Sequence, residues 1–194
     1  MTSFLHRLQL IAIALIGLFA CAGGNHTTCS SLSNDSLFDN GNDTIGEIIN
    51  VPSVDEIATV EGCRAHRDDA LRLAKWYLEQ PVNMQDMAQS KVRQFLMVWM
   101  TNTDEFSFTV GDNAAMGHIE LFAAYMAAMT EHAIEFKVNK TDEAMYCEVM
   151  LQVIEYYKRN KKVLGTVESM EKYLNMDGPT LRETLAEECR NYKF

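Results

Sequence analysis

The chain has 194 residues, of which 47% are hydrophobic, and its formal net charge is −10, with 17 Lys and Arg against 27 Asp and Glu. Nucleic-acid binding depends on basic residues that displace counterions from phosphates. The acidic balance therefore excludes nucleic acid as an expected partner, and it argues against direct docking on anionic lipid headgroups. The length suffices for one domain with its own hydrophobic core.

The first residues have the pattern of an export signal. Arg7 precedes an apolar run from Leu8 to Ala20, and Cys21 follows. A basic start, an apolar stretch of about 7–15 residues and a small-residue cleavage site are typical of a secretory signal peptide, whereas a membrane-spanning helix needs about 20 apolar residues. Residues 1–21 are therefore predicted to be a signal peptide.

Two routes of processing fit the end of this signal. Residues 18–21, Leu-Phe-Ala-Cys, resemble the lipobox of bacterial lipoproteins, in which the cysteine is lipidated and becomes the new N-terminus. Ala20-Cys21-Ala22 equally fits the A-x-A site of the ordinary signal peptidase. A diacylated Cys21 would anchor the protein at a membrane surface and would be its only expected contact with the membrane. The expected location is the cell envelope, as a periplasmic or outer-membrane lipoprotein, or alternatively outside the cell as a secreted protein.

Residues 22–52 are predicted to be a flexible polar linker. The segment is rich in Gly, Asn, Ser, Thr and Asp and has too few apolar residues to form a core. Ser36 and Thr44 each lie in an Asp-Ser/Thr-apolar triplet that resembles the O-glycosylation acceptor of exported Bacteroidota proteins. They are candidate glycosylation sites, with an ordinary solvated linker as the alternative.

Beyond the linker the pattern is helical. The segment from Ser53 to Glu56 has the capping-box form, which predicts a helix start at Ser53, with a possible interruption at Gly62 and an end at Pro81. Asn83 is expected to cap the next helix, which runs to about Thr101.

Residues 103–112 alternate apolar and polar side chains, which predicts a short extended segment. Since a single strand cannot form a sheet, we expect a loop that packs Phe106 and Phe108 on the helical core. Further helices are predicted over about 113–136, 141–157, 166–174 and around 181–189. The predicted fold is all-α, a compact bundle of about five to six antiparallel helices (helical hairpins) in residues 53–194.

Four cysteines follow the predicted signal peptide: Cys29, Cys63, Cys147 and Cys189. An export route permits disulfides among them, because the compartments outside the cytoplasm are oxidising. Their wide spacing equally fits buried free thiols, above all for Cys147 and Cys189.

Three blocks carry a resemblance to a protein family: residues 91–100 (KVRQFLMVWM), 106–111 (FSFTVG) and 125–129 (YMAAM). They resemble a block in small uncharacterised exported, lipoprotein-like proteins of Bacteroidota. The resemblance implies a bacterial source and a helical architecture, and it brings no functional residue with it.

No catalytic signature is present, since the zinc-protease HExxH, the nucleophile elbow GxSxG, the phosphate loop GxxxxGK[ST], the dinucleotide GxGxxG and paired CxxC are all missing. The sequence therefore indicates no catalytic residue and no cofactor, and it favours a role without chemistry over that of an enzyme, with a metalloenzyme kept as an alternative. The charged residues of the predicted helix 113–136, including His118 and Glu120, are interpreted as a solvated face.

A metal-handling protein or metalloenzyme is the alternative function. Cys63, His66 and Asp69 would share a face of a continuous helix and could offer a thiolate, an imidazole and a carboxylate to a metal. Three Met-x-x-Met pairs have a spacing that can hold Cu(I), although methionine also fills helical cores. These pairs are Met84/Met87, Met97/Met100 and Met126/Met129.

The principal functional hypothesis is a binding module that recognises an envelope protein or ligand. We expect the binding surface at the loop of residues 101–112, with Trp99, Phe106 and Phe108 as aromatic anchors, because loops on a rigid scaffold often carry binding residues. A purely structural envelope component would share the same fold.

Overall fold

A computed structural model describes residues 49–191, all of which lie in the second of two units of the chain, Ile45–Phe194. Residues 49–191 form helices and no strands, and one isolated parallel β-bridge joins Ser107 to Lys140. The prediction of an all-helical domain is therefore confirmed. The candidate modification sites Cys21, Ser36 and Thr44 lie outside the described residues.

The helical domain begins with a turn where the capping box predicted a helix. The Ser53 backbone N donates to the Glu56 carboxylate at 2.7 Å, as in a capping box, but residues 54–57 form only a turn. The first helix, α2 (Val60–Ala65), is capped by Thr59. The turn folds back onto α2 so closely that a Cβ on Gly62 would lie 2.0 Å from the Glu56 carbonyl oxygen.

The next helix, α3 (Arg67–Glu79), ends before Pro81 as predicted, and it buries a stripe of residues at helical spacing, Ala70, Leu73, Ala74 and Tyr77. The last residues of the predicted linker belong to the domain. Ile49 and Val51 pack on its core, and Arg72 donates to the Asn50 carbonyl at 2.8 Å.

The next two helices begin later than predicted. Asp86, not Asn83, caps α4 (Met87–Asn102), and its carboxylate accepts from the Ala88 backbone N at 2.7 Å. The helix predicted from residue 113 is α5 (Ile119–Phe136), which is capped by His118. The Asn113 side chain accepts from the Ala115 backbone N at 3.0 Å and so holds a turn in front of α5.

The C-terminal part contains three helices. The longest, α6 (Glu143–Leu164), continues beyond Tyr157 and ends at Gly165. The short α7 (Glu168–Glu171) lies within the predicted segment 166–174, and α8 (Gly178–Asn191) buries Leu181, Leu185 and Cys189.

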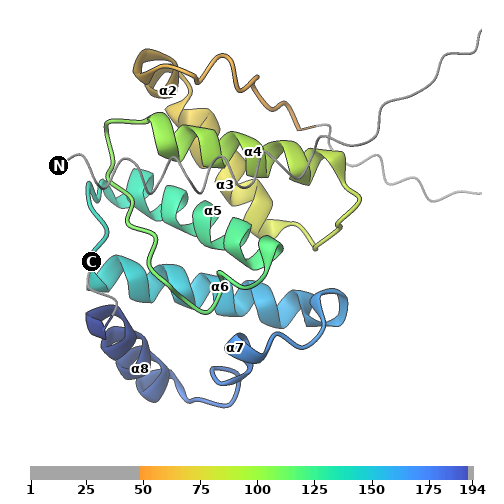
Figure 1. Cartoon of the computed structure of the whole chain (residues 1–194), viewed down its shortest axis with the longest axis vertical. Coiled ribbons are helices and arrows are strands. Elements are labelled where there is room, and N and C mark those ends of the chain that lie inside the picture. The colour runs from red at the N-terminus through yellow and green to blue at the C-terminus, as the bar shows by residue number, and fades with distance from the viewer. Residues whose placement is uncertain (1–48, 192–194) are drawn as a thin grey trace, which may run out of the picture. The chain divides into compact units, whose positions relative to one another are not determined.

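The helices share one hydrophobic core. α5 packs against α3 on one side and α6 on the other, α4 packs against α3 and α5, and α8 packs against α6 (Figure 1). The core is rich in aromatic side chains, and its largest fully buried members are Trp99, Tyr77, Tyr125, Tyr146, Tyr156, Tyr157 and Tyr173. Within residues 49–191, no helix combines the length and the hydropathy that a membrane crossing requires.

Candidate functional site

The connection between α4 and α5, residues 103–118, is unusually long for a compact helical domain, and connections of this length often carry function. It crosses in front of α5 in the view of Figure 1. The Ser107 backbone N donates to the Asn139 carbonyl at 2.8 Å, and the Thr109 backbone N donates to the Thr141 hydroxyl at 3.1 Å. The connection is thus tied to the loop between α5 and α6.

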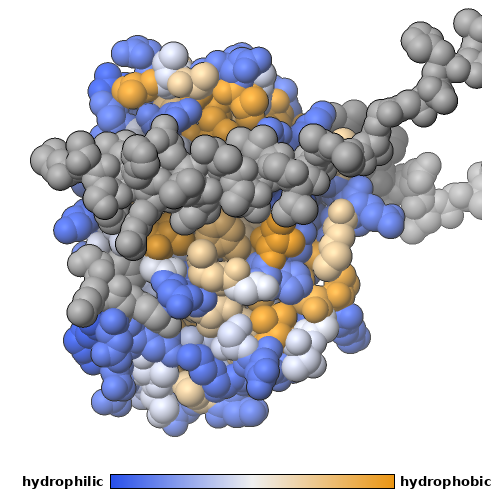
Figure 2. Space-filling view, in the orientation of Figure 1, coloured by the Kyte–Doolittle hydropathy of each residue, from blue (hydrophilic) through white to orange (hydrophobic). Residues whose placement is uncertain are grey.

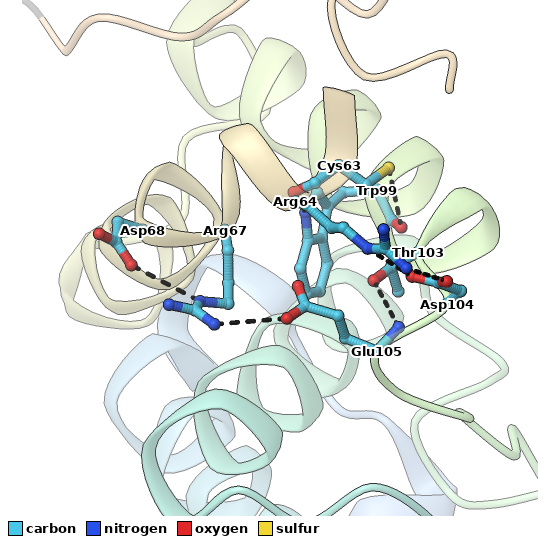
Figure 3. A network of polar contacts seen from close by, with 8 residues as sticks. All are labelled: Cys63, Arg64, Arg67, Asp68, Trp99, Thr103, Asp104 and Glu105. Carbon is cyan, nitrogen blue, oxygen red and sulfur yellow. Dashed lines mark hydrogen bonds and ion pairs between the residues drawn. The ribbon is translucent and has the colours of Figure 1, made fainter. Parts of the chain in front are cut away.

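Ion pairs fix the start of the connection to α2 and α3 (Figure 3). Arg64 contacts Asp104 with two nitrogens, at 3.1 and 2.5 Å, and Arg67 donates to Glu105 at 3.3 Å. The Thr103 hydroxyl accepts from the Glu105 backbone N at 3.3 Å. Since the Arg64–Asp104 pair is about half exposed, it contributes little to stability and acts mainly on the geometry of the connection.

The three predicted aromatic anchors form one cluster, with ring centroids 6.0–6.3 Å apart. Trp99 has no exposed surface, and its indole N donates to the Cys63 carbonyl at 2.9 Å. The placement of Trp99 on a binding surface is therefore wrong, because its ring and its polar atom are both used inside the core. Phe106 and Phe108 are half-buried and pack on that core, as the pattern of the segment predicts.

The second half of the connection carries exposed apolar side chains that the sequence analysis did not select. Val110 is 41% exposed, Met116 is 38% exposed, and Ile119, the first residue of α5, is 60% exposed. We call these three residues the apolar edge. On the face shown in Figure 2, hydrophobic residues form several areas among hydrophilic ones.

The metal candidates Cys63, His66 and Asp69 do not form one site. His66 breaks the helix between α2 and α3, so the assumed continuous face does not exist. The Cys63 thiol lies in the core, 3.3 Å from the Ile57 carbonyl, whereas His66 Nδ1 lies 2.9 Å from the Asp69 carboxylate. Among residues 49–191, no group of three or more His, Cys, Asp or Glu side chains could hold a metal ion.

The methionine pairs are in three different environments. Met126 and Met129 are buried in the core, and Met97 and Met100 are partly buried against it. Met84 and Met87 are 56% and 70% exposed. The first two pairs fill the core in the way that methionine commonly does in helical proteins.

A buried polar cluster joins α3, α4 and α5. Glu120 is only 2% exposed, accepts from the Tyr77 hydroxyl at 2.8 Å and forms an ion pair with Arg93 at 2.5 Å. The interpretation of Glu120 as a solvated residue is therefore wrong. Partial burial opposes the charge of Arg93, but Glu120 and Tyr77 together more than offset this effect and raise the pKa of Arg93.

Tyrosine packing completes this cluster. Tyr156 of α6 stacks on Tyr77, with ring centroids 6.1 Å apart. Burial raises the pKa of Tyr77, and neighbouring Tyr156 and Glu120 add to the effect. The Glu120 carboxylate accepts from both Arg93 and Tyr77 and so joins α3, α4 and α5, and the stacked Tyr156 adds α6 to the arrangement. The sequence near residue 120 carries no signal for this burial, because Arg93 and Tyr77 come from two other helices.

A shallow groove between α3, α5, α6 and α8 carries several charged side chains, and some of them have partners. Arg182 donates to Glu148 at 2.6 Å, and Gln152 donates to Glu131 at 3.4 Å. Burial raises the pKa of Glu131, and the neighbouring Glu135 carboxylate adds to this effect. The groove offers no catalytic arrangement.

Comparison of the chain with protein-family models, with curated proteins and with solved structures finds no match.

Proposed function

We propose that the chain is an exported bacterial protein, anchored to a membrane of the cell envelope through a lipidated Cys21, whose helical domain binds another envelope protein. The leader, the polar linker and the resemblance to exported Bacteroidota proteins support the location. In this proposal the linker carries O-glycans at Ser36 and Thr44 and holds the domain, a bundle of antiparallel helical hairpins, away from the membrane.

The observation that carries the binding proposal is the apolar edge on a connection whose geometry is held in place. Val110, Met116 and Ile119 expose hydrophobic surface instead of packing into the core. Ion pairs and hydrogen bonds hold the same connection at its start and its middle. The Ser169 hydroxyl donates to the Ala114 carbonyl at 2.7 Å and holds it near its end. A surface that is ordered before binding loses less conformational entropy when a partner docks.

Photo-crosslinking in a Bacteroidota host tests this proposal. A photoreactive amino acid at position 119 should yield one discrete crosslinked product, and Met116→Lys in the same chain should reduce its yield at least about tenfold, because a charge at an apolar interface costs more than about 1.4 kcal/mol. Val163 in α6 is 56% exposed and apolar, so the same photoreactive residue at position 163 is the matched control. Equal crosslinking from positions 119 and 163 would contradict the proposal.

The anchoring part has a separate test. Cys21→Ser should move the protein from the membrane fraction to the soluble fraction without changing the thermal stability of the domain. If the wild-type chain and the Cys21→Ser variant distribute equally between the two fractions, Cys21 carries no anchor.

A further inference from the structure

Two buried cysteines lie on neighbouring helices in the C-terminal part of the domain. Cys147 of α6 is 9% exposed and Cys189 of α8 is 5% exposed, and both are free thiols in the structure. α6 and α8 pack against each other, and in Figure 1 the C-terminal end of α8 lies near the start of α6. Each cysteine belongs to the buried face of its own helix.

Two ion pairs set the register of the helices around these thiols. Arg190, the residue after Cys189, donates to both carboxylate oxygens of Glu143 at 3.2 Å. Glu143 lies one helical turn before Cys147, which corresponds to about 6 Å along the axis. Arg182 and Glu148 form the second pair, at 2.6 Å. This register places Cys147 and Cys189 within about one helical turn of each other along the helix axes.

The pKa values of the two thiols argue against a role as reactive thiolates. Burial raises the pKa of Cys189 to about 11, and the neighbouring Cys147 thiol adds to this effect. Burial also raises the pKa of Cys147. Thiols with raised pKa values are poor nucleophiles at neutral pH, so they do not serve as catalytic or metal-binding thiolates there.

We propose that Cys147 and Cys189 are a disulfide-forming pair that closes when the chain reaches an oxidising compartment. This step rests on the export part of the proposed function. Two S–H bonds break and one S–S bond forms. The two electrons and two protons reduce the disulfide of a thiol–disulfide oxidoreductase, or of oxidised glutathione, to two thiols. The bond fixes α8, the last helix, to α6 across a loop of about 40 residues.

Peptide mapping of the full chain tests the pairing without any requirement for export. The reduced protein is equilibrated in a glutathione redox buffer, alkylated without unfolding and digested. We expect a linked peptide that joins Cys147 to Cys189. The intact oxidised chain should have a mass about 2 Da below that of the reduced chain. Cys63 should become alkylated only after the protein is unfolded. Free thiols at both Cys147 and Cys189, or a link from either of them to Cys29, would overturn the proposal.

Thermal unfolding provides a second readout. A reductant should lower the Tm of the oxidised wild-type chain and of Cys63→Ser by roughly 10 °C. It should leave the Tm of Cys147→Ser unchanged, whatever the stability of that variant. If the bond forms in the redox buffer but the chain isolated from its host carries free thiols, the pairing stands and the proposed export is wrong.

Discussion

The buried ion pair between Arg93 and Glu120 makes the most quantitative prediction. The Glu120 side chain is 3% exposed, and its carboxylate has two partners, Arg93 and the Tyr77 hydroxyl. Arg93→Met keeps most of the apolar packing of the side chain but removes the positive charge. The carboxylate then stays buried with a single hydroxyl donor. Breaking a buried pair in this way costs about 3–5 kcal/mol, and we expect about 3 kcal/mol because Arg93 itself is 18% exposed.

Urea unfolding, followed by circular dichroism, measures this loss as a change in the free energy of unfolding. Adding Glu120→Gln to Arg93→Met should recover roughly half of the loss, since the amide oxygen still accepts from Tyr77 and no buried charge remains. Arg182→Met breaks an exposed pair with Glu148 and is the matched control, and it should destabilise the domain far less than Arg93→Met, because exposed ion pairs contribute little to stability. A loss below about 1 kcal/mol for Arg93→Met, or a double variant no more stable than the single one, would refute this reasoning.

Three further results are expected. Gly62→Ala should destabilise the domain by at least about 2 kcal/mol in urea unfolding, because the added Cβ would meet the Glu56 carbonyl. Gly117 has open space around it, so the control Gly117→Ala should change the free energy of unfolding by no more than about 0.5 kcal/mol. Equal effects of the two substitutions would contradict the close approach at Gly62. Trp99→Ala should cost about 3–5 kcal/mol as a core truncation, and a folded variant of unchanged stability would return Trp99 to the surface. Burial raises the pKa of three tyrosines above their unfolded value, so their contribution to stability is complete below about pH 10 and decreases as the pH rises towards the folded-state values. These tyrosines are Tyr77, Tyr125 and Tyr156, and the pKa of Tyr156 is raised to about 12. At alkaline pH the absorbance at the phenolate band should therefore be lower for the folded chain than for the urea-unfolded chain. Equal titration curves for the two states would contradict the burial of these side chains.

Elements whose buried face follows a regular helical period could be predicted from the sequence. The stripe of Ala70, Leu73, Ala74 and Tyr77 in α3 is an example, and so is the end of that helix before Pro81. The packing of Phe106 and Phe108 was also predictable, because alternating side chains in one extended segment place the two rings on the same side.

Helix starts were harder to predict because several polar residues near each start can form a cap. The capping-box bond of Ser53 forms, yet it closes an isolated turn, because the chain then folds back over Gly62. Similarly, Asn113 caps a turn six residues before α5 begins at Ile119. A local hydrogen bond can thus satisfy its motif without nucleating a helix, and tertiary contacts decide which cap continues.

Partners that are distant in sequence could not be predicted. The burial of Glu120 depends on Arg93 and Tyr77, which come from two other helices. The burial of Trp99 depends on the Cys63 carbonyl, which accepts its indole N–H. No pattern local to residues 99 or 120 contains this information, so a tryptophan beside a loop and a glutamate near a helix start were both assigned to the surface.

The N-terminus and the mass of the chain recovered from its host test the central claim most directly. We predict that the protein isolated from the membrane fraction begins at Cys21 and carries a mass excess equal to diacylglycerol plus any acyl and glycan groups on the linker. Recovery of the chain from the cytosol with residues 1–20 still attached and no added mass would contradict the proposed export, the anchor and the envelope partner together.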